Sequence, residues 1–343
     1  MPAAASPAHV PVAEVTRGAI VESLHQGSVA VVDRAGRVLH AAGDPHALVF
    51  TRSSLKPLQA LPFVAAGGPA RFGYSAAQTA LLCASHSGEP RHAEAVADML
   101  ARAGLHGNAL LCGTHVPGFY ETVGRTPPPP PYSPLQHNCS GKHAGMLAWC
   151  VQCSAPTGDY VAYDHPLQQA IRQAVATFTG VALDRLVPAT DGCSAPNYAL
   201  PLSGLARAFA RLATAGDDPD YGDAPRTLAA AMTAHPEMVS GAQRSDAALM
   251  RAGRGDFVTK IGAEAVQAIG VRSAGIGIAI KVADGHKRAL YPTIVAVLDQ
   301  LRLLDGEARR ELAPWARPTL RNYRGLATGE VRSVVVLDKG ATP

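Results

Sequence analysis

Aromatic side chains and long apolar runs are both scarce in this sequence. Phe, Trp and Tyr make up 5% of the 343 residues. No run reaches the roughly 20 apolar residues that a membrane-spanning helix needs. The basic residues are scattered and have little aromatic interleaving, although the formal net charge is +4. We therefore expect neither a membrane nor a nucleic acid as a partner.

Export signals are also missing. Residues 1–11 lack the basic start and the unbroken apolar core of a signal peptide. The six cysteines lie in a long chain without such a signal, where thiols normally stay reduced. These features predict a cytoplasmic protein.

Strand-like segments cluster at both ends of the chain, and the middle is mainly helical. We expect strands at residues 28–33, 37–41, 47–50, 257–261, 275–282 and 331–338. Helical spacing occurs at 54–65, 75–83, 91–103, 143–153, 167–179, 202–214 and 290–304. Pro62 is expected to bend or end the first of these helices, and Pro127 to Pro131 to form an extended loop.

This order predicts an α/β (α+β) fold. Its sheet comes from both termini, about 10–50 and 257–340, and is flanked by helices, with a largely helical part at about 54–255. Neither an internal repeat nor a linker divides the chain, so we expect one domain over 1–343.

A Ser-x-x-Lys motif lies where an extended segment turns into a helix. Residues three apart share a helix face, so Lys56 can reach the Ser53 hydroxyl. A lysine activates a serine as its base if burial or a nearby cation lowers the lysine pKa. The helix start and Arg52 favour a neutral Lys56 and developing negative charge. The alternatives are an N-cap serine with an exposed lysine, and Ser54 as the nucleophile.

The order of later motifs in the chain strengthens this interpretation. Penicillin-recognising serine enzymes carry Ser-x-x-Lys, a middle polar motif and then Lys-Thr-Gly on a late strand. Here Lys260-Ile-Gly lies at the end of a late predicted strand, and Ser85 or Ser140 supplies a middle serine. Lys260 can also be read as an exposed strand lysine, and Lys281 can be mistaken for it.

Two loops each carry a cysteine among other polar residues. Residues 136–143 and 191–196 place Cys139 and Cys193 near other polar groups that can hold a soft divalent ion such as zinc. A Cys139 nucleophile with His137 or His143 is an alternative chemistry. We read Cys150 and Cys153 as small apolar residues near a helix end.

Longer motifs resemble the Rhizobium-type, thermolabile L-asparaginase II family over nearly the whole chain. They are residues 52–62 (RSSLKPLQALP), 83–92 (CASHSGEPRH), 137–147 (HNCSGKHAGML), 191–196 (DGCSAP) and 260–264 (KIGAE). The resemblance implies a serine-β-lactamase-like fold and a homodimer. The sequence departs from the family pattern at Ser194 and Ala265, where the pattern has glycine.

The resemblance also assigns site residues. It implies two Ser–Lys pairs, Ser53 with Lys56 and Ser85 with Lys260. It implies zinc held by Cys139, Lys142 and Cys193, which aids substrate binding. A lysine ligand must be neutral, which the metal charge favours. Arg52 and Asp191 lie in motifs that line the family's pocket.

The function expected from these motifs is hydrolysis of L-asparagine to L-aspartate and ammonia by a lysine-activated serine. The alternatives are an L-glutaminase, a β-lactamase or D-Ala-peptidase-like serine hydrolase, and a catalytically silent, zinc-stabilised binding protein. One methylene is worth only about 1–3 kcal/mol in a pocket, so the sequence separates asparagine from glutamine poorly.

Overall fold

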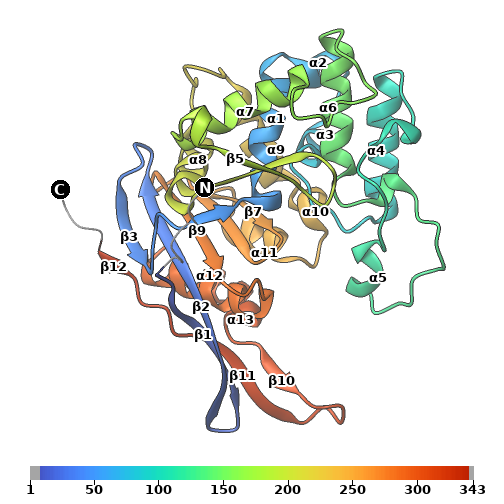
Figure 1. Ribbon diagram of the computed structural model, residues 1–343. Helices are drawn as coiled ribbons and strands as arrows, with labels where there is room; N and C mark the ends of the chain where they lie inside the picture. Colours follow the sequence, from blue (N-terminus) through green and yellow to red (C-terminus); the bar gives the residue numbers. More distant parts are fainter. Residues whose placement is uncertain (1–7, 340–343) are drawn as a thin grey trace.

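The computed structural model describes residues 8–339 and is built around a large antiparallel sheet (Figure 1). The strand order is β10-β11-β1-β2-β9-β8-β7, and β3 and β12 pair with each other beside β2. The strands are β1 (Val10–Arg17), β2 (Ile20–Asp33), β3 (Val38–Ala42), β7 (Phe257–Gly262), β8 (Val266–Val271), β9 (Ile276–Val282), β10 (Thr319–Arg321), β11 (Ala327–Ser333) and β12 (Asp338–Lys339). All of them come from the two ends of the sequence, as predicted.

Strand β2 shows how the sheet divides two hydrophobic cores. Side chains alternate between faces along a strand. Val29 and Val31 join one core cluster, while Ala30 and Val32 join the other. All four side chains are fully buried. Both faces of the sheet are therefore covered, which explains why this part of β2 is a continuous apolar run.

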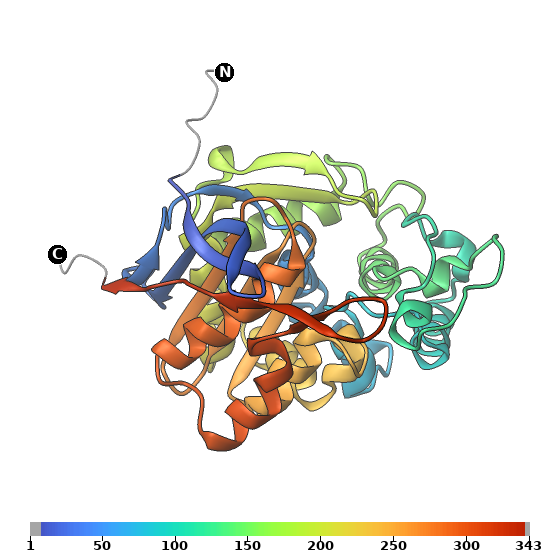
Figure 2. The same ribbon diagram turned by 90° about the horizontal axis from the view of Figure 1, so that it is seen from below.

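Helices supply the two coverings. The first core contains α1 (Lys56–Ala65), α3 (Ala76–Leu81), α4 (Pro90–Arg102), α6 (Ser140–Gln152), α7 (Pro166–Thr179), α8 (Leu202–Thr214), α9 (Ala224–Ala234) and α10 (Pro236–Ser240). The second contains α12 (Lys287–Gln300), α13 (Gly306–Ala316) and three side chains of α11 (Ser245–Ala252), namely Ala248, Leu249 and Ala252. The view from below separates α12 and α13 from the main helical group (Figure 2).

Helix α8 packs against the sheet without side chains between the backbones at two points. A Cβ at Gly277 would lie 1.8 Å from the Ala206 carbonyl oxygen, and one at Gly270 would lie 2.2 Å from that of Phe209. Real atoms do not approach so closely, so any side chain here would push helix and sheet apart.

The predicted fold class, with an antiparallel sheet from both ends flanked by helices, is confirmed, with differences in detail. The segment predicted to be helical also contains β5 (Val187–Thr190) and β6 (Pro196–Pro201), which form a second sheet with β4 (Leu48–Phe50). The predicted strand at 28–33 begins at Ile20, and α1 continues past Pro62 to Ala65. The predicted final strand is replaced by β11 and β12.

None of the helices in the described part of the chain combines the length and apolar character needed to cross a membrane.

The contact between α8 and the sheet gives the first test. We expect Gly277→Ala to lower the free energy of unfolding by about 1–3 kcal/mol, because the new methyl group overpacks a rigid contact. Gly216→Ala is the control, since its Cβ would meet open space. Urea denaturation measures both variants. Equal stability of the two would contradict the close packing.

Candidate active site

A short 3-10 helix, η1 (Arg52–Leu55), carries the Ser-x-x-Lys motif into α1. Ser54 is fully buried, and its hydroxyl donates a hydrogen bond of 2.6 Å to the Thr51 carbonyl. Ser53 is half-buried, and its hydroxyl makes no hydrogen bond within residues 8–339. Ser54 therefore has a structural contact, and Ser53 is the more exposed of the two serines.

Lys56 is buried, which excludes the alternative of an exposed lysine after an N-cap serine. Only 1% of its surface is accessible. Its Nζ donates to the carbonyl oxygens of Ala84 and Asn138 and to Ser85 Oγ, the last at 2.9 Å. Three oxygen atoms thus surround the buried amine.

The expected pairing of the serines and lysines differs from the observed hydrogen bonds. Lys56 bonds Ser85, and the described chain contains no hydrogen bond from Lys56 to Ser53 or from Lys260 to Ser85. The acceptors around Ser85 draw the Lys56 amine away from its own helix turn. All four residues nevertheless belong to one connected region.

Gly262 allows the strand that carries Lys260 to pack closely against the Ser-x-x-Lys motif. A Cβ at Gly262, the last residue of β7, would lie 2.8 Å from the Thr51 carbonyl oxygen and 3.3 Å from the Ser54 nitrogen. Strand β7 therefore packs directly on η1. Lys260 lies two residues earlier, close enough for the Lys56 charge to act on its pKa.

Lys260 is fully buried on β7, so it is not an exposed strand lysine. Its Nζ donates to the Ile261 carbonyl at 2.7 Å and lies 3.5 Å from Asp246 Oδ2. Burial lowers the pKa of Lys260 to about 8, and the charges of Lys56 and Arg244 act in the same direction against Asp246. Lys260 can thus take up and release a proton near neutral pH.

Asp246 is a site residue that the sequence did not indicate. It lies in the first turn of α11, is fully buried, and accepts hydrogen bonds from the Ile261 backbone, Thr259 and Gln267. These bonds fix the carboxylate beside Lys260. The local sequence Arg244-Ser-Asp has no distinctive spacing, so only the fold reveals this role.

Arg52 and Asp191 form an ion pair, as their motifs suggested. Arg52 Nε lies 2.9 Å from Asp191 Oδ1. Burial raises the pKa of Asp191, but the Gly192 backbone N–H and the charges of Lys142 and Arg52 outweigh it, and the net pKa is lowered. The carboxylate is therefore ionised at neutral pH.

The two departures from the family pattern have left-handed backbones. Ser194, in the Asp191 loop, has φ +69°, and Ala265, in the turn after β7, has φ +51°. Glycine adopts such angles without steric cost. The expectation of glycine at both positions thus has a conformational reason.

The predicted zinc ligands converge in the first core. Lys142 Nζ lies 3.0 Å from Cys193 Sγ. The neighbouring Cys193 side chain lowers the pKa of the Cys139 thiol well below its ordinary value, against the effect of burial and with help from Lys56 and Lys142.

Two soft sulfur donors and an amine can hold zinc. His143 Nε2, from the same turn of α6, is buried without a hydrogen-bond partner in the part of the chain described. The residues present therefore fit such an ion. They do not make a site of three His, Cys, Asp or Glu residues, and no such group exists within 8–339.

A cysteine–histidine nucleophile is not supported. His137 Nδ1 accepts the Cys139 backbone N–H at 3.0 Å, and His143 Nδ1 lies 2.8 Å from the Tyr160 hydroxyl. Neither ring is hydrogen-bonded to the Cys139 sulfur in the described residues. Cys150 is buried and Cys153 is exposed at the end of α6, so they form no common site.

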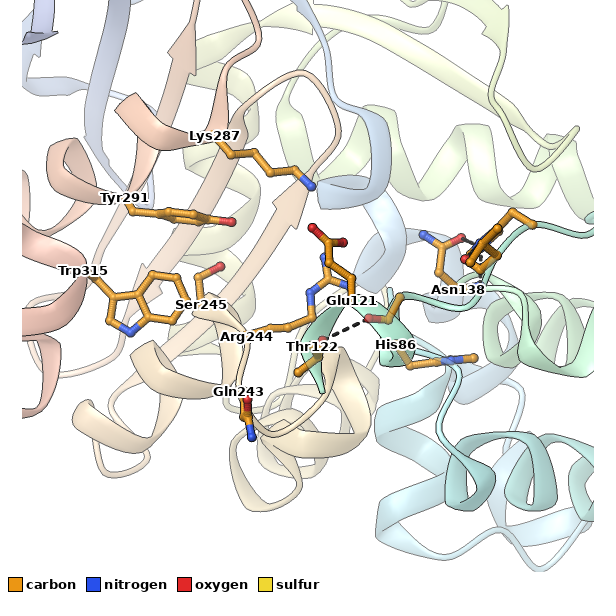
Figure 3. A pocket seen from close by; sticks show the side chains of 13 residues that line it. His86, Glu121, Thr122, Asn138, Gln243, Arg244, Ser245, Lys287, Tyr291 and Trp315 are labelled. Atoms are coloured by element: carbon orange, nitrogen blue, oxygen red, sulfur yellow. Dashed lines mark hydrogen bonds between the residues drawn. The ribbon is translucent and has the colours of Figure 1, made fainter. Parts of the chain in front are cut away.

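A pocket of about 470 Å³ opens beside the Ser85 loop (Figure 3). Its lining includes His86, Asn138 and Arg244. Each of these residues adjoins Ser85 or Lys56, either in sequence or through a hydrogen bond. His86 follows Ser85, the Asn138 carbonyl accepts from Lys56, and Arg244 Nη1 donates to the Ser85 carbonyl at 3.2 Å. Ser53, Lys56, Ser85 and Lys260 are not among the residues that line the pocket.

Comparison with known proteins gives one extensive match. The L-asparaginase II family model matches residues 13–333. No curated protein sequence matches the chain.

Two solved structures show a likeness in outline. One is a crystal structure of a protein named Mglu in 4.3 M NaCl. Its identity is 13%, its TM-score is 0.44, and the match covers 82% of this chain but 62% of Mglu. The other is a beta-lactamase from Mycobacterium bovis, with 15% identity, a TM-score of 0.41, and coverage of 84% and 95%. The chain thus spans less than two thirds of the Mglu structure.

The lowered pKa of Lys260 predicts a pH dependence of stability. In the unfolded chain the lysine returns to its ordinary value of 10.5, so above about pH 8 the unfolded state binds more protons than the folded state. The free energy of unfolding should rise between pH 8 and 9, by at most about 1.4 kcal/mol per unit. Denaturation at several pH values measures this slope.

Lys260→Met should lose the Lys260 contribution to the slope, whereas Lys339→Met, at an exposed position on β12, should retain it. A slope that is the same in Lys260→Met as in the wild type would show that Lys260 does not titrate in this range.

Proposed function

Because the chain belongs to the L-asparaginase II family and is therefore an amidohydrolase, we propose that it hydrolyses L-asparagine to L-aspartate and ammonia. The observation that carries this proposal is the pair of buried lysines, Lys56 and Lys260, beside two serines. Buried amines with few charged partners are costly in a structural role. They are useful where a serine must lose a proton near neutral pH.

Ser53 is the nucleophile in this proposal, and Lys56 is its base. The half-buried Ser53 hydroxyl attacks the side-chain amide carbon, and its proton passes to Lys56. Lys56 is three residues away, and catalytic hydrogen bonds often tighten only when substrate is bound. Backbone N–H groups at the start of η1, including that of Ser53, would stabilise the oxyanion.

Ser85 and Lys260 return the proton to the leaving nitrogen. The Lys56–Ser85 hydrogen bond supports a route from the base to Ser85. The pKa of Lys260, about 8, supports its exchanging protons at this point. Water then hydrolyses the acyl-enzyme ester, which releases aspartate and restores the Ser53 hydroxyl.

Arg52 and Asp191 orient the substrate. The ionised Asp191 suits the α-ammonium group of asparagine, and the guanidinium of Arg52 suits its α-carboxylate. The ion pair between them fixes both side chains beside Ser53, which follows Arg52 in the sequence. This preorganisation reduces the cost of fixing the substrate.

We further propose that Cys139, Lys142 and Cys193 hold zinc. When bound, zinc supplies a positive charge that favours an anionic substrate group nearby, rather than an activated water. Lys142 would be neutral as a ligand, and the two cysteines would be thiolates.

The cell compartment and assembly are also proposals. All six cysteines are free thiols, which supports the cytoplasm. A homodimer is proposed from the family resemblance.

Substitution of the nucleophile tests the mechanism. We expect Ser53→Ala to lower ammonia release from asparagine by roughly three orders of magnitude or more, because the acyl-enzyme can no longer form. Ser54→Ala is the matched control and should retain activity. Parallel assays with glutamine determine the substrate preference, and nitrocefin detects β-lactamase activity. Full activity of Ser53→Ala would contradict the proposed mechanism.

Metal removal tests the zinc proposal. The purified protein should contain about one zinc per chain, because the three proposed ligands form one site. The Cys193→Ser variant should contain no zinc. Chelation should raise KM for asparagine several-fold and leave the circular dichroism spectrum unchanged. If chelation unfolds the chain and no amide is hydrolysed, the silent zinc-stabilised protein is the correct description.

A further inference from the structure

Arg52, which comes directly before the proposed nucleophile, has a left-handed backbone. Its φ is +49°, an angle that crowding around Cβ makes rare for residues with a side chain. Glycine would adopt this angle without steric cost, but it would lack the guanidinium that pairs with Asp191. Strained backbone angles persist only where surrounding contacts hold them, and they cluster at active sites. The contacts that hold Arg52 therefore bear on the position of Ser53.

The side chain of Asn197, on β6, holds the Arg52 backbone by two hydrogen bonds. Asn197 Oδ1 accepts the Arg52 N–H at 3.0 Å, and Asn197 Nδ2 donates to the Arg52 carbonyl oxygen at 3.0 Å. Asn197 is buried, so water hardly competes for these bonds. A primary amide offers both the acceptor and the donor that the two bonds need.

The bond to the Arg52 carbonyl also orients the Ser53 N–H. The Arg52 carbonyl and the Ser53 N–H belong to one peptide group, which is planar and trans, so they point in opposite directions. Because Asn197 fixes the carbonyl, it also fixes the direction of this N–H. Within residues 8–339 the Ser53 N–H forms no hydrogen bond, so its donor capacity is unused.

The hairpin that carries Asn197 also holds the Arg52 side chain. Asp191 follows β5, and its Oδ1 accepts from Arg52 Nε at 2.9 Å and from the Gly192 N–H at 2.8 Å. Strand β6 pairs with β5 and with β4, the strand that leads into η1. The β5–β6 hairpin thus fixes Arg52 at its side chain through Asp191 and at its backbone through Asn197.

We infer that Asn197 is a positioning residue for the proposed hydrolysis and aims the Ser53 N–H at the oxyanion. This inference rests on the proposed function, in which that N–H is an oxyanion donor. Asn197 acts through the peptide group between Arg52 and Ser53. Its hydrogen bond to the carbonyl also polarises the peptide group, which strengthens the N–H as a donor.

The effect of Asn197 belongs to the transition state. The oxyanion forms only as Ser53 attacks the amide carbon, so a misdirected N–H slows this step without weakening the binding of asparagine. The ion pair between Arg52 and Asp191, proposed to bind the substrate, uses the Arg52 side chain and remains possible without Asn197. A change at Asn197 should therefore affect kcat far more than KM.

Asn197→Ala, which removes both hydrogen bonds, gives the first test. We expect kcat for asparagine to fall about 10- to 100-fold, less than when an oxyanion donor is deleted, because the Ser53 N–H is still present. KM should change by less than about threefold. Asn108→Ala is the control and should leave both constants unchanged, because Asn108 is exposed and its side chain forms no hydrogen bond in the described chain.

Asn197→Asp gives a signature that a merely structural role would not give. A protonated carboxyl group accepts through one oxygen and donates through its O–H, as the amide does, whereas a carboxylate has no donor. We expect kcat of this variant, divided by that of the wild type, to rise as the pH falls from about 8 to about 5. KM and the circular dichroism spectrum should stay unchanged over this range. The ratio for Asn197→Ala should not rise, and if that variant fails to fold, the Asn197→Asp ratio alone decides.

The outcomes separate this inference from the proposed function. Wild-type kcat in Asn197→Ala, a loss expressed only in KM, or a pH-independent ratio for Asn197→Asp overturns the role of Asn197 and leaves the asparaginase proposal standing. A wild type that hydrolyses no amide, or a fully active Ser53→Ala, overturns the proposed mechanism and the role of Asn197 with it.

Discussion

Burial of two lysine amines at the junction of α1 and β7 is the constraint on which the site depends. An ammonium removed from water needs acceptors, or it loses its proton. Lys56 finds carbonyl oxygens and the Ser85 hydroxyl, whereas Lys260 has one carbonyl and a carboxylate at 3.5 Å. Burial is the main cause that lowers the pKa of Lys260 to about 8. Burial of these amines therefore opposes folding, while it favours the proposed proton transfer.

Close backbone contacts hold these amines in place. Gly262 lets β7 touch η1, and Gly277 lets α8 lie on β9. Because neither contact contains a flexible side chain, small displacements are costly. Asp246 adds a polar anchor from α11, which ties the second core to the strand that carries Lys260. The reactive groups thus come from segments far apart in sequence but rigidly packed in space.

The sequence predicted the sheet from both chain ends and several helices, because periodicity and turn residues report on local structure. The family resemblance, rather than periodicity, supplied the two Ser–Lys pairs, Ser53 with Lys56 and Ser85 with Lys260. The sequence did not predict that Lys56 bonds Ser85, because that choice depends on carbonyl acceptors brought in by distant loops. Asp246 was missed for the same reason. β1 and β8 were missed because their pairing depends on tertiary contacts more than on local propensity.

The identity of the acylated serine tests the central claim most directly. The protein is mixed with asparagine, quenched with acid within milliseconds, digested, and its peptides are weighed by mass spectrometry. An aspartyl adduct on Ser53 is the predicted result, since Ser53 is the accessible hydroxyl at the helix start. An adduct on Ser85, the serine that Lys56 contacts, would contradict the account and exchange the roles of the two serines.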